Sequence, residues 1–293
     1  MASWQGKSQA TPLGYRIFVV VLKRWGLGPA YFLLRFVSFY YWVFSRQSSL
    51  ALRRFFSEHL RYSSWKTRKA VYRTYFQFGQ TLIDKVAVMA GLNPKLSFDF
   101  DGEEWLHQMV REGRGGLLLS AHVGNWEIAG HLLKRLKTSI NVVMYDGEQE
   151  QIKAYLEKVT GGRNMKLIII REDLSHIFAI NDALANNELV CMHADRFLPG
   201  NKTLSTQFLG KTANFPAGPF LLAATLKVPV SFVYAFKETS SHYHFYACEP
   251  LLYNSGSRDE RMKKALQDFV VETEKKVLQY PTQWFNFYDF WEA

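Results

Sequence analysis

The chain has 293 residues, a formal net charge of +10 and 48% hydrophobic residues. That apolar fraction supplies a substantial core and excludes general disorder, and the length suits one large α/β domain or two small ones. Two cysteines, Cys191 and Cys248, provide no disulfide framework, as expected for a protein of a reducing compartment.

Positive charge is concentrated in the N-terminal quarter. Up to residue 73 the chain carries thirteen Lys and Arg and a single acid, Glu58, so the remainder is slightly acidic. Residues 30–45 add eight aromatic side chains and only one charge. Neither this stretch nor residues 17–28, which two basic residues interrupt, offers the ~20 uninterrupted apolar residues of a spanning helix. No small-residue cleavage site follows, which argues against a removable signal peptide.

Apolar and aromatic residues flanked by Arg and Lys are typical of a helix that lies on an anionic lipid surface. We therefore predict a helical, membrane-associating segment over residues 1–95, followed by an α/β core over 96–293, as one continuous structural unit. The alternatives are a pair of core helices whose aromatics pack inside the protein, or a true membrane span. No nucleic-acid partner is expected, because no zinc-finger, RNP-like or helix-turn-helix pattern accompanies the basic residues.

Hydrophobic periodicity predicts the elements that follow. Helical spacing over residues 49–92 stops at Gly91 and Pro94. Strands are then predicted at 115–122, 139–145, 165–171, 188–194 and 203–209, and helices at 125–136, 149–160, 173–186 and 216–227. A late strand pair at 228–237 and 241–248 precedes a long helix at 257–279 and an aromatic tail. Apolar strands that alternate with helices predict an α/β fold with a mostly parallel sheet flanked by helices on both faces.

A histidine and a glutamate follow the first of these strands, in the sequence AHVGNWEIAG (121–130). Five positions on a straight helix leave two side chains ~140° apart, so His122 and Glu127 can meet only if His122 lies in the strand-to-helix turn. Gly124 permits that turn, and Asn125 suits the N-cap and is a candidate substrate contact. Glu127 would orient the imidazole as its acidic partner. A histidine followed by an acid five residues later is also common by chance.

The chemistry of this pair depends on what lies beside it. No Ser or Cys nucleophile is nearby in the sequence, which indicates that the histidine activates a hydroxyl or amine of a bound substrate. A metal site is not predicted, because HVGNWE lacks the two histidines of a zincin helix. Cys191 and His193 can share a face of their strand, but further ligands are missing. We expect neither a metal nor an organic cofactor.

The HxxxxE motif resembles the HX4D/E signature of glycerolipid-type acyltransferases. The downstream sequence is similar to the bacterial lipid A late acyltransferases, through MHADRFLPG (192–200), FLGKTANFPAGPFLLAATLKVPV (208–230) and YPTQWFNFYDFW (280–291). The resemblance runs from about residue 12 to the end. It implies an acyltransferase-like fold and transfer of a fatty acyl chain to a hydroxyl of a lipid A precursor. The resemblance also implies that the donor is acyl carrier protein or acyl-CoA. It implies that the reaction takes place at the cytoplasmic face of the cell inner membrane.

The resemblance also assigns roles to residues at other strand ends. Asp195 and Arg196 match a block that positions the acceptor or completes the site, with a structural salt bridge as the alternative. Arg171 matches a second block more loosely. Lys211 is a candidate contact for a phosphate or a carrier protein, or else a solvated loop lysine. Trp284, in the aromatic tail, is predicted to pack against the core, with contact to lipid as the alternative.

Two functional alternatives remain open at this point. The same machinery can acylate an aminolipid, another phospholipid or a polyene lipid, because no residue in the sequence specifies the acceptor. The protein can also be a lipid-binding protein that keeps the fold without the chemistry, although the presence of His122, Glu127, Asp195 and Arg196 argues against this.

Overall fold

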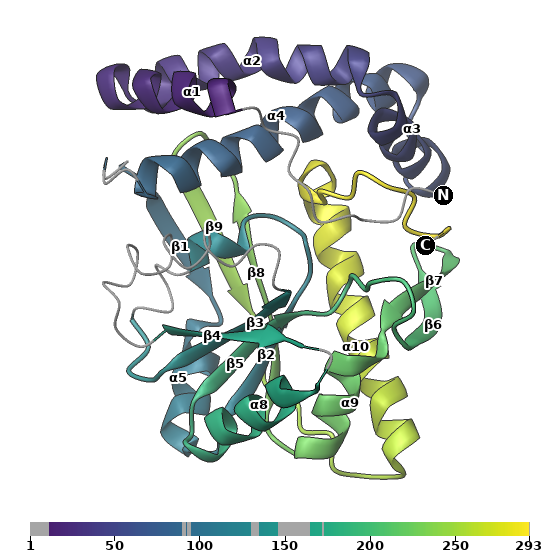
Figure 1. The fold of residues 1–293 in the computed structure, drawn as a ribbon. Helices are drawn as coiled ribbons and strands as arrows, with labels where there is room; N and C mark the ends of the chain where they lie inside the picture. Colours follow the sequence, from purple (N-terminus) through teal and green to yellow (C-terminus); the bar gives the residue numbers. More distant parts are fainter. Residues whose placement is uncertain are drawn as a thin grey trace.

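The protein is described here by a computed structural model, which covers residues 12–89, 92, 95–129, 135–145, 165–171 and 173–292. In these residues a central sheet has the strand order β1-β9-β8-β2-β5-β3-β4 (Figure 1). Its strands are β1 (Ser97–Asp101), β2 (Gly116–Ser120), β3 (Ile140–Tyr145), β4 (Met165–Ile170), β5 (Leu189–His193), β8 (Val230–Lys237) and β9 (His242–Ala247).

The sheet is mostly parallel, as the sequence predicts. All neighbouring strands run parallel except β8 and β9, which form an antiparallel pair. Every residue of β2 is buried, as expected for a strand at the centre of a sheet that is covered on both faces. The prediction of a mostly parallel α/β fold is therefore confirmed.

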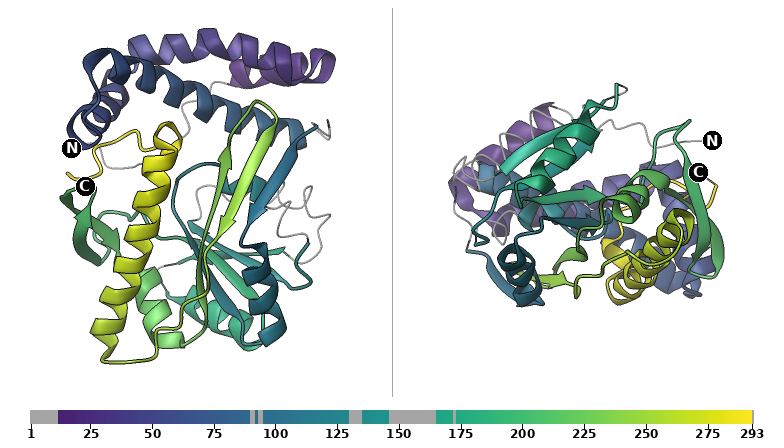
Figure 2. Two further views of the ribbon diagram at one scale, coloured as in Figure 1. Left: turned by 180° about the vertical axis from the view of Figure 1, so that it is seen from behind. Right: turned by 90° about the horizontal axis from the view of Figure 1, so that it is seen from below.

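Helices flank this sheet. They are α5 (Glu103–Glu112), α8 (Ser175–Ala185), α9 (Ala217–Leu226) and α10 (Arg258–Gln279), which runs along the side of the sheet (Figure 2). α10 begins where predicted, because Ser257 and Glu260 form a reciprocal capping box. The helix predicted at 149–160 lies outside the described residues.

A small antiparallel hairpin stands apart from the main sheet. It consists of β6 (Thr203–Phe208) and β7 (Lys211–Pro216), joined by Leu209 and Gly210. Both turn residues have positive φ, 51° and 80°, as a two-residue type I′ turn requires. The sequence predicts β6, but β7 is absent from the prediction.

Four helices and a π-helical turn form an N-terminal layer at one end of the sheet. They are α1 (Pro12–Trp25), α2 (Leu27–Phe44), α3 (Arg46–Arg54), the π-helical turn η1 (Phe55–His59) and α4 (Ser64–Met89). α4 lies between the α1–α2 pair and the sheet (Figure 1). The helical run predicted over 49–92 is thus interrupted, at a point where Arg61 has a φ of 55°. Within the described residues, no helix combines the length and apolar character needed to cross a membrane.

The C-terminal tail packs into the protein. After the short 3-10 helix η4 (Pro281–Gln283), Trp284 lies buried against Phe55, Phe208 and Phe290. Trp291 stacks on His59, with ring centroids 3.4 Å apart. The tail therefore joins the N-terminal layer to the β6–β7 hairpin, in agreement with the core-packing interpretation of Trp284.

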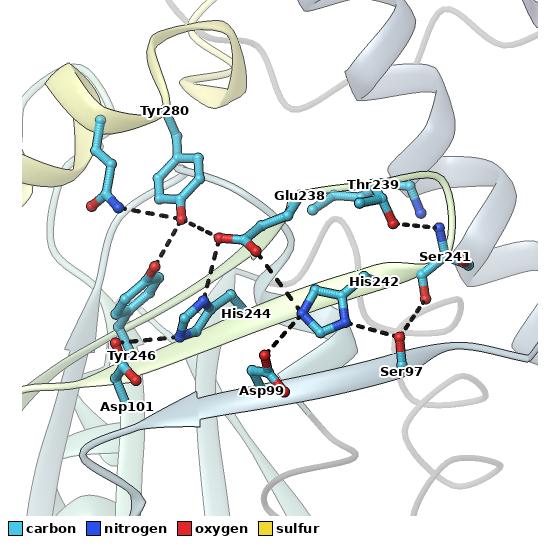
Figure 3. A network of polar contacts seen from close by, with 12 residues as sticks. Ser97, Asp99, Asp101, Glu238, Thr239, Ser241, His242, His244, Tyr246 and Tyr280 are labelled. Atoms are coloured by element: carbon cyan, nitrogen blue, oxygen red, sulfur yellow. Dashed lines mark hydrogen bonds and ion pairs between the residues drawn. The ribbon is translucent and has the colours of Figure 1, made fainter.

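The edge strand β1 is joined to β9 by a polar cluster (Figure 3). His242 lies 3.5 Å from Asp99, and His244 lies 3.3 Å from Asp101. Glu238 contacts both histidines and accepts a hydrogen bond from the hydroxyl of Tyr280 at 2.7 Å. This cluster ties a strand with alternating exposed residues to the end of α10.

Candidate active site

The loop that carries His122 is held on two sides. Gly124 pairs with Ala235 of β8, and its N–H donates to the carbonyl oxygen of Gln283 in the tail at 2.8 Å. Gly124 has a φ of 72°, and a Cβ there would lie 2.0 Å from the oxygen of Ala235. Only glycine fits this position, because the strained φ and the close backbone exclude any side chain. His122 therefore occupies a strand-to-loop turn, as the sequence predicts.

The carboxylate that contacts the ring of His122 is Asp195. Its Oδ1 lies 2.7 Å from His122 Nδ1, and its Oδ2 accepts the backbone N–H of His122 at 2.9 Å. Asp195 is 3% exposed. Since both oxygens bind one residue, Asp195 fixes the backbone and the ring together, and it directs Nε2 of His122 away from the carboxylate.

The environment of Asp195 favours the carboxylate form. Burial alone would raise its pKa, but the adjacent His122, by its charge and its hydrogen bond, and Arg196 outweigh that effect. The pKa of Asp195 consequently lies well below its ordinary value. A permanently ionised, buried carboxylate stabilises an imidazolium when His122 accepts a proton.

A second histidine, His193, packs against the first. Its Nδ1 lies 3.1 Å from Nε2 and 3.3 Å from Nδ1 of His122, and the two rings are perpendicular. Nearly equal distances to both nitrogens place this atom over the face of the His122 ring. Burial, followed by the charge of His122, lowers the pKa of His193 well below 6.5. His193 is therefore neutral, and Trp126 lies edge-on to it at 5.2 Å as a wall of the site.

Sequence reasoning did not select His193 as a site residue. The available signal was its place on β5, two residues before Asp195, with its side chain on the same face of the strand. β5 pairs directly with β2, where Ser120 lies opposite His193. Neighbouring parallel strands thus end side by side, and this brings His122, His193 and Asp195 together.

These three residues are also where a metal ion would fit best in the described part of the chain. Their ligand atoms lie within 4.8 Å of one another. However, both oxygens of Asp195 already bind His122, and Nδ1 of His193 points at a ring face. The donor atoms therefore do not converge on one point, as a tetrahedral site requires. The geometry suits a hydrogen-bonded base better than a metal centre.

Arg196 is bound to the C-terminal tail. Its Nη2 donates to the carbonyl oxygen of Phe285 at 2.8 Å, and its guanidinium lies 5.9 Å from the centre of the Tyr288 ring. The N–H of Phe285 in turn donates to the carbonyl oxygen of His122 at 3.3 Å. Arg196 thus helps to hold the tail against the loop of His122.

Other predicted site residues lie elsewhere. Arg171 follows β4, which is the edge strand, so two strands separate it from β2. Its side chain is exposed. Lys211 pairs with Glu58 at 3.0 Å on the surface. The structure does not bring these two residues into contact with His122, and their substrate-binding roles stay predictions.

The predicted helix over 125–136 can be compared with the structure only at its two ends, because residues 130–134 lie outside the described part. Residues Trp126–Ala129 form a 3-10 turn (η2), and the chain at 135–138 is non-helical. Asn125 is buried, and it is bound to Ala235 of β8 and Tyr243 of β9. Asn125 directly precedes this turn, and its role as an N-cap stays a prediction. The side chain of Glu127 lies outside the described part, and its contact with the ring stays a prediction.

A histidine at the carboxyl end of a central strand, oriented by a buried carboxylate, is an arrangement in which an imidazole can act as a general base. The family model described as bacterial lipid A biosynthesis acyltransferase matches residues 14–292. The chain therefore belongs to the bacterial lipid A biosynthesis acyltransferase family and is an acyltransferase. This confirms the resemblance found in its motifs.

The solved structures that match this chain include one acyltransferase. The 1-acyl-sn-glycerophosphate (LPA) acyltransferase PlsC from Thermotoga maritima is 13% identical, with a TM-score of 0.39. The match covers 90% of this chain and 97% of that one. A search of curated proteins finds no match.

Proposed function

We propose that this protein transfers a fatty acyl chain from a thioester donor directly to a hydroxyl of a membrane glycolipid such as a lipid A precursor. The donor is acyl carrier protein or acyl-CoA. The observation that carries the proposal is the bond between His122 Nδ1 and the buried Asp195, which fixes the ring with Nε2 pointing away from the carboxylate. Family membership supports acyl transfer to a lipid.

The proposed reaction uses no covalent intermediate on the enzyme. His122 Nε2 takes the proton of the acceptor hydroxyl while the oxygen of that hydroxyl attacks the thioester carbonyl carbon. The tetrahedral intermediate then collapses, the C–S bond breaks, and the thiolate takes the proton back from the imidazolium. Asp195 stabilises the imidazolium throughout. A base positioned in this way contributes about 10²–10⁴ to the rate.

The backbone around His122 restricts how the oxyanion is bound. The N–H of His122 donates to Asp195, that of Gly124 to Gln283, and that of Asn125 to Ala235. These three groups are committed to the fold. Oxyanion stabilisation must therefore come from other donors.

The N-terminal layer supports action at a membrane surface. On α2 an aromatic stripe faces outward, formed by Phe32, Phe36, Phe39, Tyr40 and Phe44, all exposed. The opposite face, with Ala30, Tyr31, Leu34 and Ser38, is buried. A contiguous exposed apolar stripe of this kind marks an interaction surface, and nearby basic residues of α3 and α4 suit an anionic lipid surface.

Membrane association can be tested with vesicles at several salt concentrations. We expect binding to anionic vesicles, partial release in high salt and full extraction only with detergent, because the aromatic contribution does not depend on salt. Replacing Arg53, Arg61, Arg68 and Lys69 by Gln should weaken binding to anionic vesicles far more than to neutral ones. Arg54 is kept in this variant, because it pairs with Asp289 and Glu292 of the tail. A wild-type protein that stays in solution with anionic vesicles at low salt would contradict this part of the proposal.

Acyl transfer can be tested with purified protein, acyl carrier protein or CoA thioesters, and a panel of lipid acceptors. Mass spectrometry should show one added acyl chain on a glycolipid, and treatment with hydroxylamine should release it, because esters are cleaved and amides are not. His122→Ala is the control for spontaneous transfer. Acylation of an aminolipid or polyene lipid instead would correct the acceptor. Lipid binding without transfer from either donor would overturn the proposal.

A further inference from the structure

A buried ion pair lies between the N-terminal layer and the sheet. Lys237 of β8 donates from Nζ to Asp84 of α4 at 2.6 Å, and the two side chains are 2% and 0% exposed. The hydroxyls of Tyr31 (α2) and Tyr243 (β9) also donate to the Asp84 carboxylate. Buried ion pairs add little net stability compared with apolar residues of similar volume, so their value lies in the geometry that they impose.

One hydroxyl connects this ion pair to the loop of His122. The hydroxyl of Tyr243 donates its proton to Asp84, and its oxygen accepts a hydrogen bond from Nδ2 of Asn125 at 3.2 Å. Asn125 lies three residues after His122, and its own N–H is bound to Ala235 at 2.7 Å. A continuous chain of hydrogen bonds thus runs from α2 through α4 and β9 to the loop.

A second connection runs through the backbone of Lys237. The side chain of Gln283 accepts the N–H of Lys237 and donates to its carbonyl oxygen, both at 2.9 Å. The carbonyl oxygen of Gln283 accepts the N–H of Gly124. Both connections end on residues 122–125, at adjacent positions of the loop.

We propose that Tyr31, Asp84, Lys237, Tyr243 and Asn125 form a positioning relay, which makes the geometry of loop 122–125 depend on the seating of α2 against α4. α2 is also the helix with the exposed aromatic stripe. The relay thus couples contact of that stripe with a lipid surface to the position of His122. Its link to catalysis rests on the proposed function, whereas its effect on the loop does not.

A purely structural role for these residues predicts something different. Loss of a buried hydrogen bond would then lower the stability of the whole fold, without a preference for the loop. The relay predicts instead that a substitution on α2 changes the protection of amides in loop 122–125, although this loop is distant from the substituted residue. The contribution of each residue to such a buried network can be separated only by combining substitutions in double-mutant cycles.

Tyr31→Phe removes the hydroxyl at the α2 end and keeps the ring. Tyr234→Phe is the matched control, because Tyr234 is also buried and its hydroxyl contacts Thr273 at 2.8 Å, outside the relay. Hydrogen exchange, followed by mass spectrometry, would be measured on peptides that cover residues 118–128. We expect exchange in this loop to rise about three- to tenfold in Tyr31→Phe, the effect of losing one hydrogen bond, and to stay at the wild-type rate in Tyr234→Phe.

Unchanged loop exchange in Tyr31→Phe overturns the relay, and so does an equal rise in both variants. If Tyr31→Phe does not fold, Tyr243→Phe makes the same test at the junction of the relay. In acyl transfer, Tyr31→Phe should lower kcat with little change in KM. That effect should be smaller in an Asn125→Ala background, which keeps only the connection through Gln283, and fully multiplicative effects would contradict the relay. A wild-type protein that transfers no acyl chain defeats the proposed function, while the exchange result still decides the relay.

Discussion

The His122–Asp195 pair and the β1–β9 cluster use the same chemical groups, histidine and carboxylate, to different ends. Asp195 is 3% exposed and binds His122 at 2.7 and 2.9 Å. In the other cluster, the side chains of Asp99 and Asp101 are 71% and 66% exposed and lie 3.5 and 3.3 Å from His242 and His244 (Figure 3). Residue type alone therefore does not identify a catalytic base.

The difference lies in solvent and in fixed geometry. Exposed ion pairs are screened and contribute about 0–1 kcal/mol, so the β1–β9 cluster mainly helps to hold an edge strand. Asp195 is removed from water and keeps its charge, because His122 and Arg196 surround it. A histidine next to such a group can take up a proton at a defined position.

The largest expected effect comes from removing the base. His122→Ala should lower acyl transfer by about 10²–10⁴ and leave the protein folded, with a lower thermal stability because the buried Asp195 loses a partner. His244→Gln is the matched control in the exposed cluster, and its activity should stay close to that of the wild type. Normal turnover by His122→Ala would show that His122 is not the general base.

Replacing the buried carboxylate should have the next largest effect. Asp195→Asn keeps a hydrogen-bonding group beside Nδ1 but loses the charge that stabilises the imidazolium, and we expect a loss of about 10²-fold or more in kcat. Steady-state kinetics would measure it, with Asp101→Asn as the control. If both substitutions leave kcat intact, Asp195 is no more catalytic than its exposed counterpart.

Glu127 was predicted as the acidic partner of His122. Because Asp195 already binds Nδ1, Glu127→Gln should impair the reaction less than Asp195→Asn does, by less than about tenfold. A direct comparison of kcat for the two variants shows which carboxylate contributes more to catalysis. A larger loss in Glu127→Gln would return the principal role to the glutamate.

The smallest effect concerns stability in acid. The pKa of His193 is lower in the folded protein than the ordinary value of 6.5, so the unfolded chain binds a proton that the folded protein does not. Stability should therefore be complete above about pH 6.5 and fall by about 1.4 kcal/mol per pH unit below it, until the folded pKa is reached. Urea unfolding between pH 7 and 5 should show a weaker slope in His193→Gln than in the wild type. Equal slopes would show that His193 is not held neutral.

Much of this fold follows from local patterns. Continuous apolar runs identify β2, β3 and β8, and a reciprocal cap marks the start of α10. The sequence analysis missed β1, whose SFDFD sequence exposes acids at an edge, and β7, which contains Lys, Asn and Pro. These strands form because their partners hold them, which local propensity does not record.

Part of the candidate site can also be predicted from the sequence, because it lies at the ends of predicted strands. His122 at a strand end, and Asp195 at the same rim, follow from strands that run parallel. The bond between them joins residues 73 positions apart and depends on β5 lying next to β2. The strand order of the sheet cannot be read from periodicity, so the sequence favoured the nearby Glu127 over the distant Asp195.

A double-mutant cycle on His122 and Asp195 tests the central claim most directly. It would compare single-turnover rates of acyl transfer for His122→Ala, Asp195→Asn and the double variant at saturating donor and acceptor. If Asp195 acts through His122, the double variant should be no slower than His122→Ala alone, because groups that act as a unit are strongly non-additive. Losses that multiply, with each substitution slowing the reaction by its full factor in both backgrounds, would contradict the account.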